Sequence, residues 1–321
     1  MKKRLLALLC VFSILIPTIS FASGAANRED VIYGVALNDE QKSQMNNAFD
    51  IENTENIKFD TVDGKDLEKY LGYSTADYNM ISSVYIKTLA DNSGIKVNIV
   101  TPANITKISN SQYTNAAITA GISDADIYVA SPKPVTGESA LVGVYKALEN
   151  TGQVIDVARA QTAQEELEVV SEISEENKDK ADFDPTEFDR VVIEVKQKLA
   201  DHKEETGQTA SSEQIVAYIN DALKNVNMEN ILSNNNINIL VNYFEKYQNT
   251  DAINSEEVRD NLMKLGNDLA NSASQFYEDN KETIDDAVSK AQDSGLIDSF
   301  LDFLSSLFKT IASIFSSNNE N

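Results

Sequence analysis

Cysteine, histidine and tryptophan are nearly missing from this chain of 321 residues, which has one, one and none of them. The single cysteine, Cys10, lies in an apolar stretch at the N-terminus that looks like a removable leader. Without the leader, the chain has no disulfide, no thiolate nucleophile and no cysteine ligand for a metal. The large Leu9 before Cys10 also argues against a lipidated cysteine, because that position needs a small residue.

The single histidine, His202, limits the remaining chemistry further. One imidazole cannot make a histidine-rich zinc site, and any Ser-His-acid triad would have to use this residue. The absence of tryptophan leaves tyrosine and phenylalanine as the stacking platforms for a sugar. We therefore expect no cofactor, and no activity follows from the composition alone.

Residues 1–22 have the pattern of a secretory signal peptide. Lys2, Lys3 and Arg4 precede an apolar run over residues 5–19, and the small-x-small sequence ending at Ala22 predicts cleavage there. The alternative is an uncleaved anchor helix. The pattern predicts a secreted protein, found outside the cell or at the envelope surface, and the lack of cysteine in the exported chain is typical of a Gram-positive bacterium.

Acidic residues dominate the charged positions. Removal of the leader leaves 24 Lys and Arg residues against 51 Asp and Glu, a net charge of −27. Such a chain repels nucleic acid and anionic lipid, so we expect no nucleic-acid partner. A protein partner or self-association stays open.

Two hydropathy patterns divide the chain, and together they predict an α+β protein. An N-terminal α+β domain over 28–152 has about five strands, and Asp91-Asn-Ser-Gly94 indicates a hairpin between the third and fourth. Residues 153–185 read as an acidic helical connector and 186–294 as an all-helical region, with helix caps at Asp184 and Ser211. The other predicted strands and helices cover residues 31–37, 57–62, 83–89, 95–101 and 126–130, and 41–49, 67–71, 109–121 and 134–150.

One stretch carries a family resemblance. Residues 117–132, AITAGISDADIYVASP, contain the pattern TAG-x-x-DA-x-x-YV-x-x-P, and residues 135–149 continue it. This stretch resembles the YpuA-like, DUF1002-type family of exported Gram-positive proteins of unknown function. The resemblance implies an exported protein with this architecture, and it implies no catalytic residue, cofactor or partner.

Two groups of residues could carry chemistry. Ser139 follows a strand and opens a helix, as a nucleophile elbow does, but Leu141 replaces the expected glycine, and Ser139 with its neighbours also reads as a helix start. Asp179, Asp182, Asp184 and Glu187, with Asp189 nearby, form an acidic cluster that could bind calcium weakly or could be a solvated linker with a helix cap. The prediction is a non-enzymatic interaction or scaffold module. The alternatives are an exported hydrolase using Ser139 or an Asp/Glu pair, and a peripheral membrane protein.

Residues 295–317 form the predicted C-terminal amphipathic helix. Its apolar face could dock on the protein's own helices, which we take as the expectation, or it could contact a partner, a second copy or a membrane. Asp298, Asp302 and Lys309 interrupt it and argue against a transmembrane span. The contact residues would be Ile297, Phe300, Leu301, Leu304, Phe308, Ile311 and Phe315.

Truncation at Gly295 tests this helix. If it docks on the protein's own helices, neither the chain from Ser23 nor its shortened form floats with liposomes, and the shortened form unfolds at a lower temperature because apolar contacts are lost. Flotation of the longer chain alone would instead identify a membrane contact.

Overall fold

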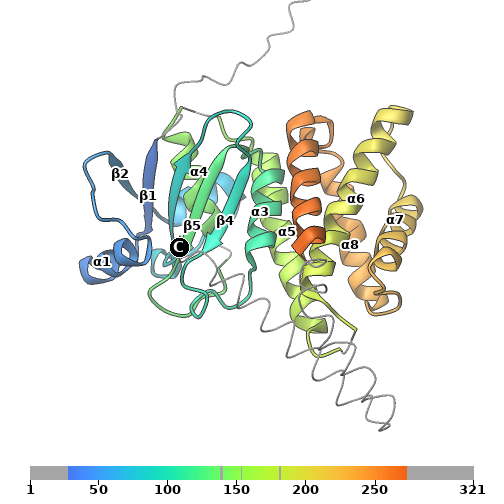
Figure 1. The fold of residues 1–321 in the computed structure, drawn as a ribbon, viewed down its shortest axis with the longest axis horizontal. Coiled ribbons are helices and arrows are strands. Elements are labelled where there is room, and N and C mark those ends of the chain that lie inside the picture. The colour runs from blue at the N-terminus through green and yellow to red at the C-terminus, as the bar shows by residue number, and fades with distance from the viewer. Residues whose placement is uncertain (1–27, 138–139, 153, 181, 273–321) are drawn as a thin grey trace, which may run out of the picture.

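The computed structural model describes residues 28–137, 140–152, 154–180 and 182–272. It has the predicted α+β architecture, with a five-stranded mixed sheet in the first half and helices in the second (Figure 1). No helix in these ranges combines the length and the apolar character that a membrane crossing needs. The strands are β1 (Glu29–Gly34), β2 (Ile57–Val62), β3 (Ser83–Thr88), β4 (Ile95–Ile99) and β5 (Ala125–Ala130).

The strand order is β2-β1-β3-β5-β4, and this order corrects the predicted hairpin. β3 and β4 do not pair with each other, because β5 lies between them, antiparallel to β3 and parallel to β4. Asn92 and Gly94 do turn the chain with positive φ, as the sequence pattern indicates. β5 is therefore an interior strand, hydrogen-bonded on both sides, and its Ile127 and Val129 are buried.

Helices cover both faces of the sheet. α1 (Asp39–Ala48) packs its Met45 with Val31, Tyr33 and Tyr85 on one face. The other face meets α2 (Gly64–Leu71), α3 (Asn110–Thr119) and α4 (Ala140–Glu149) through a larger apolar core. The short 3-10 helix η1 (Asp77–Asn79) follows α2.

The second half is a packed set of helices that stands beside α3 (Figure 1). Both predicted caps are confirmed: the Asp184 side chain accepts from the Thr186 and Glu187 amides, and Ser211 forms a capping box with Gln214. The elements are α5 (Val157–Asn177), α6 (Pro185–Thr206), α7 (Ser212–Asn225), α8 (Asn234–Tyr247), η2 (Asp251–Asn254) and a helix over residues 256–272.

α5 belongs to both cores. Ala160, Ala163 and Leu167 lie in the core beneath the sheet, while Val170 and Ile173, further along the same helix, lie in the helical core. The residues predicted to form a connector therefore contribute buried side chains to both halves of the molecule.

A close backbone approach at the end of β1 gives a stability test. A Cβ added at Gly34 would lie 2.3 Å from the Met80 carbonyl oxygen, so Gly34→Ala should lower the free energy of unfolding by about 1–3 kcal/mol. Gly266→Ala is the matched control. Gly266 lies within a helix, and a Cβ added there would make an ordinary contact, 3.4 Å from the Ile193 side chain. Equal denaturant midpoints for the two variants would contradict the steric argument.

Candidate functional site

A set of polar side chains lies buried where α3, α5, α6 and α8 meet, between the sheet half and the helical half. Asn115 and Thr119 lie one helical turn apart on α3, and Tyr243 and Tyr247 lie one turn apart on α8. We call this set the buried polar cluster: Asn115, Thr119, Glu166, Lys196, Tyr243 and Tyr247.

Lys196 is the centre of the cluster. Its side chain is 0% exposed, and that of its partner Glu166 is 2% exposed. The Lys196 Nζ lies 2.7 Å from both carboxylate oxygens of Glu166, and it also donates to Thr119 Oγ1 at 2.6 Å and Asn115 Oδ1 at 2.8 Å. An ammonium has three N–H donors, so three partner side chains satisfy it completely.

Glu166 is held from two further sides. The hydroxyls of Thr119 and Tyr243 both donate to its Oε2, each at 2.8 Å. The ring of Tyr247 completes the enclosure, with its centroid 5.2 Å from the Lys196 Nζ. Burial lowers the pKa of Lys196 against the opposing effect of Glu166, and burial raises the pKa of Tyr243 well above its usual value. Tyr243 is therefore a hydrogen-bond donor near neutral pH.

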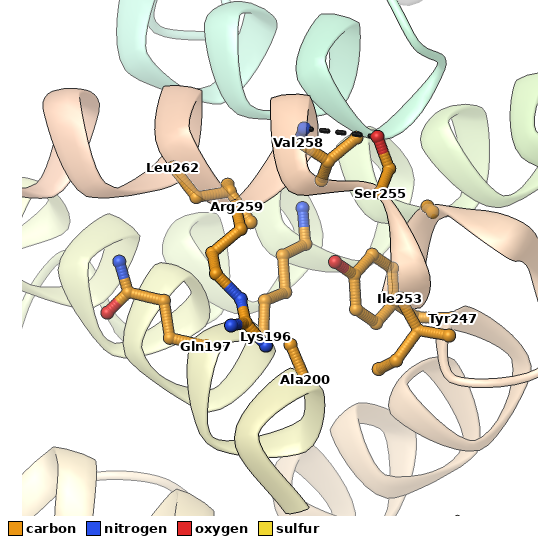
Figure 2. A pocket seen from close by; sticks show the side chains of 10 residues that line it. Lys196, Gln197, Ala200, Tyr247, Ile253, Ser255, Val258, Arg259 and Leu262 are labelled. Atoms are coloured by element: carbon orange, nitrogen blue, oxygen red, sulfur yellow. Dashed lines mark hydrogen bonds between the residues drawn. The ribbon is translucent and has the colours of Figure 1, made fainter. Parts of the chain in front are cut away.

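The cluster is closed to anything larger than water. A cavity of about 10 Å³ borders Lys196 and Tyr247, with Val258, Arg259 and Leu262 on the helix above it (Figure 2). This volume is roughly that of one water site. Arg259 bonds outward to Glu204, so the helix over residues 256–272 is tied to α6 beside the cavity. The cluster has an amine, a carboxyl, a carboxamide and three hydroxyls, but no substrate can enter it.

A second buried contact joins the same helices. Asp189 of α6 is 2% exposed, and its Oδ2 accepts from the hydroxyls of Ser109 and Ser111 at the start of α3. Its Oδ1 has no hydrogen-bond partner among the described residues. Burial raises the pKa of Asp189 to about 7, although the serine hydroxyls oppose the change. Interpreting Asp189 as part of a solvated acidic cluster was therefore wrong.

The other acidic candidates have separate roles. Asp184 caps α6 and Glu187 pairs with Arg190 at 2.6 Å, while Asp179 and Asp182 are exposed. Across the described ranges, no three His, Cys, Asp or Glu side chains gather as they would around a metal ion. The structure thus gives Asp184 and Glu187 other contacts, and it does not gather the predicted calcium residues into a metal-binding group.

The remaining predicted sites lie outside the described residues. These are Ser139, the cleavage site at Ala22 and the apolar face of the C-terminal helix. His202, the one base that a serine triad could use, lies on α6 with its Nδ1 3.0 Å from the Tyr218 hydroxyl of α7. The hydrolase hypothesis therefore gains no contact from the described part of the chain.

An open polar hollow of about 800 Å³ lies between α5 and α8. No described residue hydrogen-bonds the side-chain amides of Gln161 and Asn242, which are both exposed, and Lys246 pairs with Glu165 across the hollow at 2.6 Å. Amides that are not engaged within the protein can donate to and accept from a ligand. The lining residues are Ala158, Gln161, Thr162, Glu165, Asn242, Glu245, Lys246, Asn249 and Thr250.

Comparison with known proteins identifies the family. The family model described as "Protein of unknown function (DUF1002)" matches residues 33–265, which include both the buried polar cluster and the hollow. The chain belongs to the DUF1002 family. It is 27% identical to "Uncharacterized protein YpuA" of Bacillus subtilis (strain 168), over 98% of this chain and 100% of that protein. No solved structure matches the chain.

Three residues of the stretch that resembles the DUF1002 family have visible structural roles. Thr119 joins the buried polar cluster, and Gly121 ends α3 with φ at +88°, where the Arg159 guanidinium packs against it. The Oδ1 of Asp124 accepts from the Gly94 amide at 2.8 Å and fixes the turn before β4. The stretch therefore positions the edge of the sheet against the helical half.

A weak sequence signal could have located the buried polar cluster. Lys196 interrupts the apolar stripe that runs from Val192 through Leu199, and Glu166 lies between Ala163 and Val170 on the stripe of α5. A charge on an apolar stripe predicts a buried partner of opposite sign. Nothing in the sequence shows that these two charges meet, because the contact depends on how α5 and α6 pack.

Asp189 predicts a pH effect on stability. Its folded pKa of about 7 exceeds the unfolded value of 3.8, so the folded state binds the proton more tightly and loses stability as pH rises from 4 to 7. The variant Asp189→Asn lacks this loss. Between pH 4 and 7 its free energy of unfolding should therefore rise relative to that of the natural chain, by on the order of a few kcal/mol. Urea unfolding at a series of pH values measures the difference, with exposed Asp221→Asn as control. Parallel curves for Asp189→Asn and the natural chain would refute the assignment.

Proposed function

We propose that this protein is exported and acts outside the cytoplasm, free or loosely held at the envelope, as a non-enzymatic interaction or scaffold module. The signal-peptide pattern of residues 1–22 supports export. The observation that carries the non-enzymatic part is the closure of the buried polar cluster. Its amine and carboxyl are 0% and 2% exposed, so these groups are out of reach of a substrate.

The contact surface in this proposal is the hollow between α5 and α8. Its walls carry amide, hydroxyl and carboxylate groups and one ammonium, and they lack aromatic side chains. Such a lining suits a ligand rich in hydroxyl and amide groups more than an apolar one. The large negative net charge disfavours anionic polymers, so an uncharged or weakly charged polymer of the envelope is the class that fits best.

Binding to purified peptidoglycan, stripped of anionic polymers, tests this proposal. The full chain should co-sediment with it, and Gln161→Leu with Asn242→Leu should weaken binding at least several-fold, because two hydrogen-bonding amides are lost. The matched control is Gln44→Leu with Asn47→Leu, which removes two exposed amides from α1 on the far side of the sheet.

The same proteins, incubated with peptidoglycan or with liposomes, distinguish the rival functions. Release of soluble fragments from the polymer would identify an exported hydrolase, and binding to liposomes instead of the polymer would identify a peripheral membrane protein. Equal binding by both double variants would show that the hollow is not the contact surface. The proposal of a non-enzymatic module stands only if binding occurs without turnover.

A further inference from the structure

The buried polar cluster places an amine beside a carboxamide as well as a carboxyl. The Lys196 Nζ lies 2.8 Å from the Asn115 Oδ1 and 2.7 Å from each oxygen of Glu166. The Asn115 Oδ1 is bonded to the electrophilic carbon Cγ, and rotation of the amide about the Cβ–Cγ bond would turn the face of Cγ toward the nitrogen. The three residues come from α6, α3 and α5, which contact one another around them.

The surroundings of Lys196 and Asn115 exclude water and so favour a reaction between the two side chains. Asn115 is 3% exposed, and the rings of Tyr243 and Tyr247 shield the Lys196–Glu166 pair from solvent. Taking charge out of water favours transfer of the ammonium proton to the carboxylate, and burial accordingly lowers the pKa of Lys196. A neutral lysine amine is a nucleophile, whereas an ammonium is not.

We propose that the Lys196 Nζ and the Asn115 Cγ join in an intramolecular isopeptide bond, with Glu166 as the acid–base group. The chain would then be its own substrate at this closed site. This inference does not depend on where the protein works or on what the hollow binds.

The reaction needs no oxidant, reductant or other co-reactant. Glu166 first takes a proton from the Lys196 ammonium, and the freed electron pair of Nζ attacks Cγ while the carbonyl π electrons move to Oδ1. Glu166 then gives its proton to Nδ2 and takes the second proton of Nζ. The Cγ–Nδ2 bond breaks, the carbonyl reforms, and one amide and one ammonia result.

Two features of the cluster serve this step. The hydroxyl of Thr119 accepts from Nζ at 2.6 Å and donates to Glu166 at 2.8 Å, which fixes both groups at the point of proton transfer. The cavity of about 10 Å³ beside Lys196 can hold one leaving ammonia, which is close to water in size. It ends at the helix over residues 256–272, shown with its Val258, Arg259 and Leu262 in Figure 2.

Peptide mass spectrometry of the folded full-length chain tests the bond. After denaturation and trypsin digestion, the peptide bearing Asn115 should be found joined to the peptide bearing Lys196. The joined mass should be lower than the sum by one ammonia, about 17 Da, and trypsin should not cleave after Lys196, whose side chain is now an amide.

Recovery of the two peptides separately and unmodified from the folded chain would overturn the proposal. A joined product lighter by one water would also overturn it, because that loss places the bond on a carboxyl such as Glu166 rather than on the Asn115 carboxamide. Fragmentation of the joined peptide distinguishes these products by the residue that carries the link.

Two variants test the role of Glu166. Glu166→Gln keeps the side-chain size and the hydrogen-bonding oxygen but removes the acid–base group, and we expect its chain to stay unlinked. Asp189→Asn changes the other buried carboxyl between α3 and α6 and should leave the link intact. Circular dichroism would check that each variant is folded. A linked Glu166→Gln chain would overturn the assignment of Glu166.

Discussion

The enclosed pairing of Lys196 with Glu166 is the constraint on which the arrangement of the helices depends. A buried ammonium and a buried carboxylate each cost several kcal/mol to remove from water, and only close, complete partnering offsets that cost. The partnering here needs α3, α5, α6 and α8 at one place and in one register. A shift of α5 or α6 by one residue would separate the two charges, and a shift of α3 or α8 would remove their hydrogen-bond partners. The cluster therefore selects this packing against other apolar packings of the same stripes.

The relation between the two halves follows from this constraint. Asn115 and Thr119 belong to α3, the helix that connects β4 to β5, so the sheet half of the molecule contributes directly to the cluster. Asp189 reaches the first turn of the same helix, where Ser109 is also the helix cap. The polar groups therefore fix how α3 lies on α6, while the apolar core around them supplies most of the favourable free energy.

Local elements could be predicted from the sequence because their causes are local. The caps at Asp184 and Ser211 depend on side chains within three residues of the helix start, and β2 was placed at residues 57–62 by its own residues. The predicted hairpin failed because the neighbour of β4 is decided by β5, which follows some thirty residues later. The buried polar cluster was missed for the same reason: Lys196 and Glu166 stand out on apolar stripes, but nothing local to either residue shows that the two charges meet.

The double membership of α5 has a consequence for the order of folding. In chain order, the sheet and its first four α-helices are complete by residue 149, but Ala160, Ala163 and Leu167 have still to fill the core beneath them. The second half of α5 then offers Val170 and Ile173 to helices that follow it in the chain. The first half of the protein therefore exposes the apolar surface of an incomplete core until α5 packs against it. α5 then becomes the surface on which the helical half assembles.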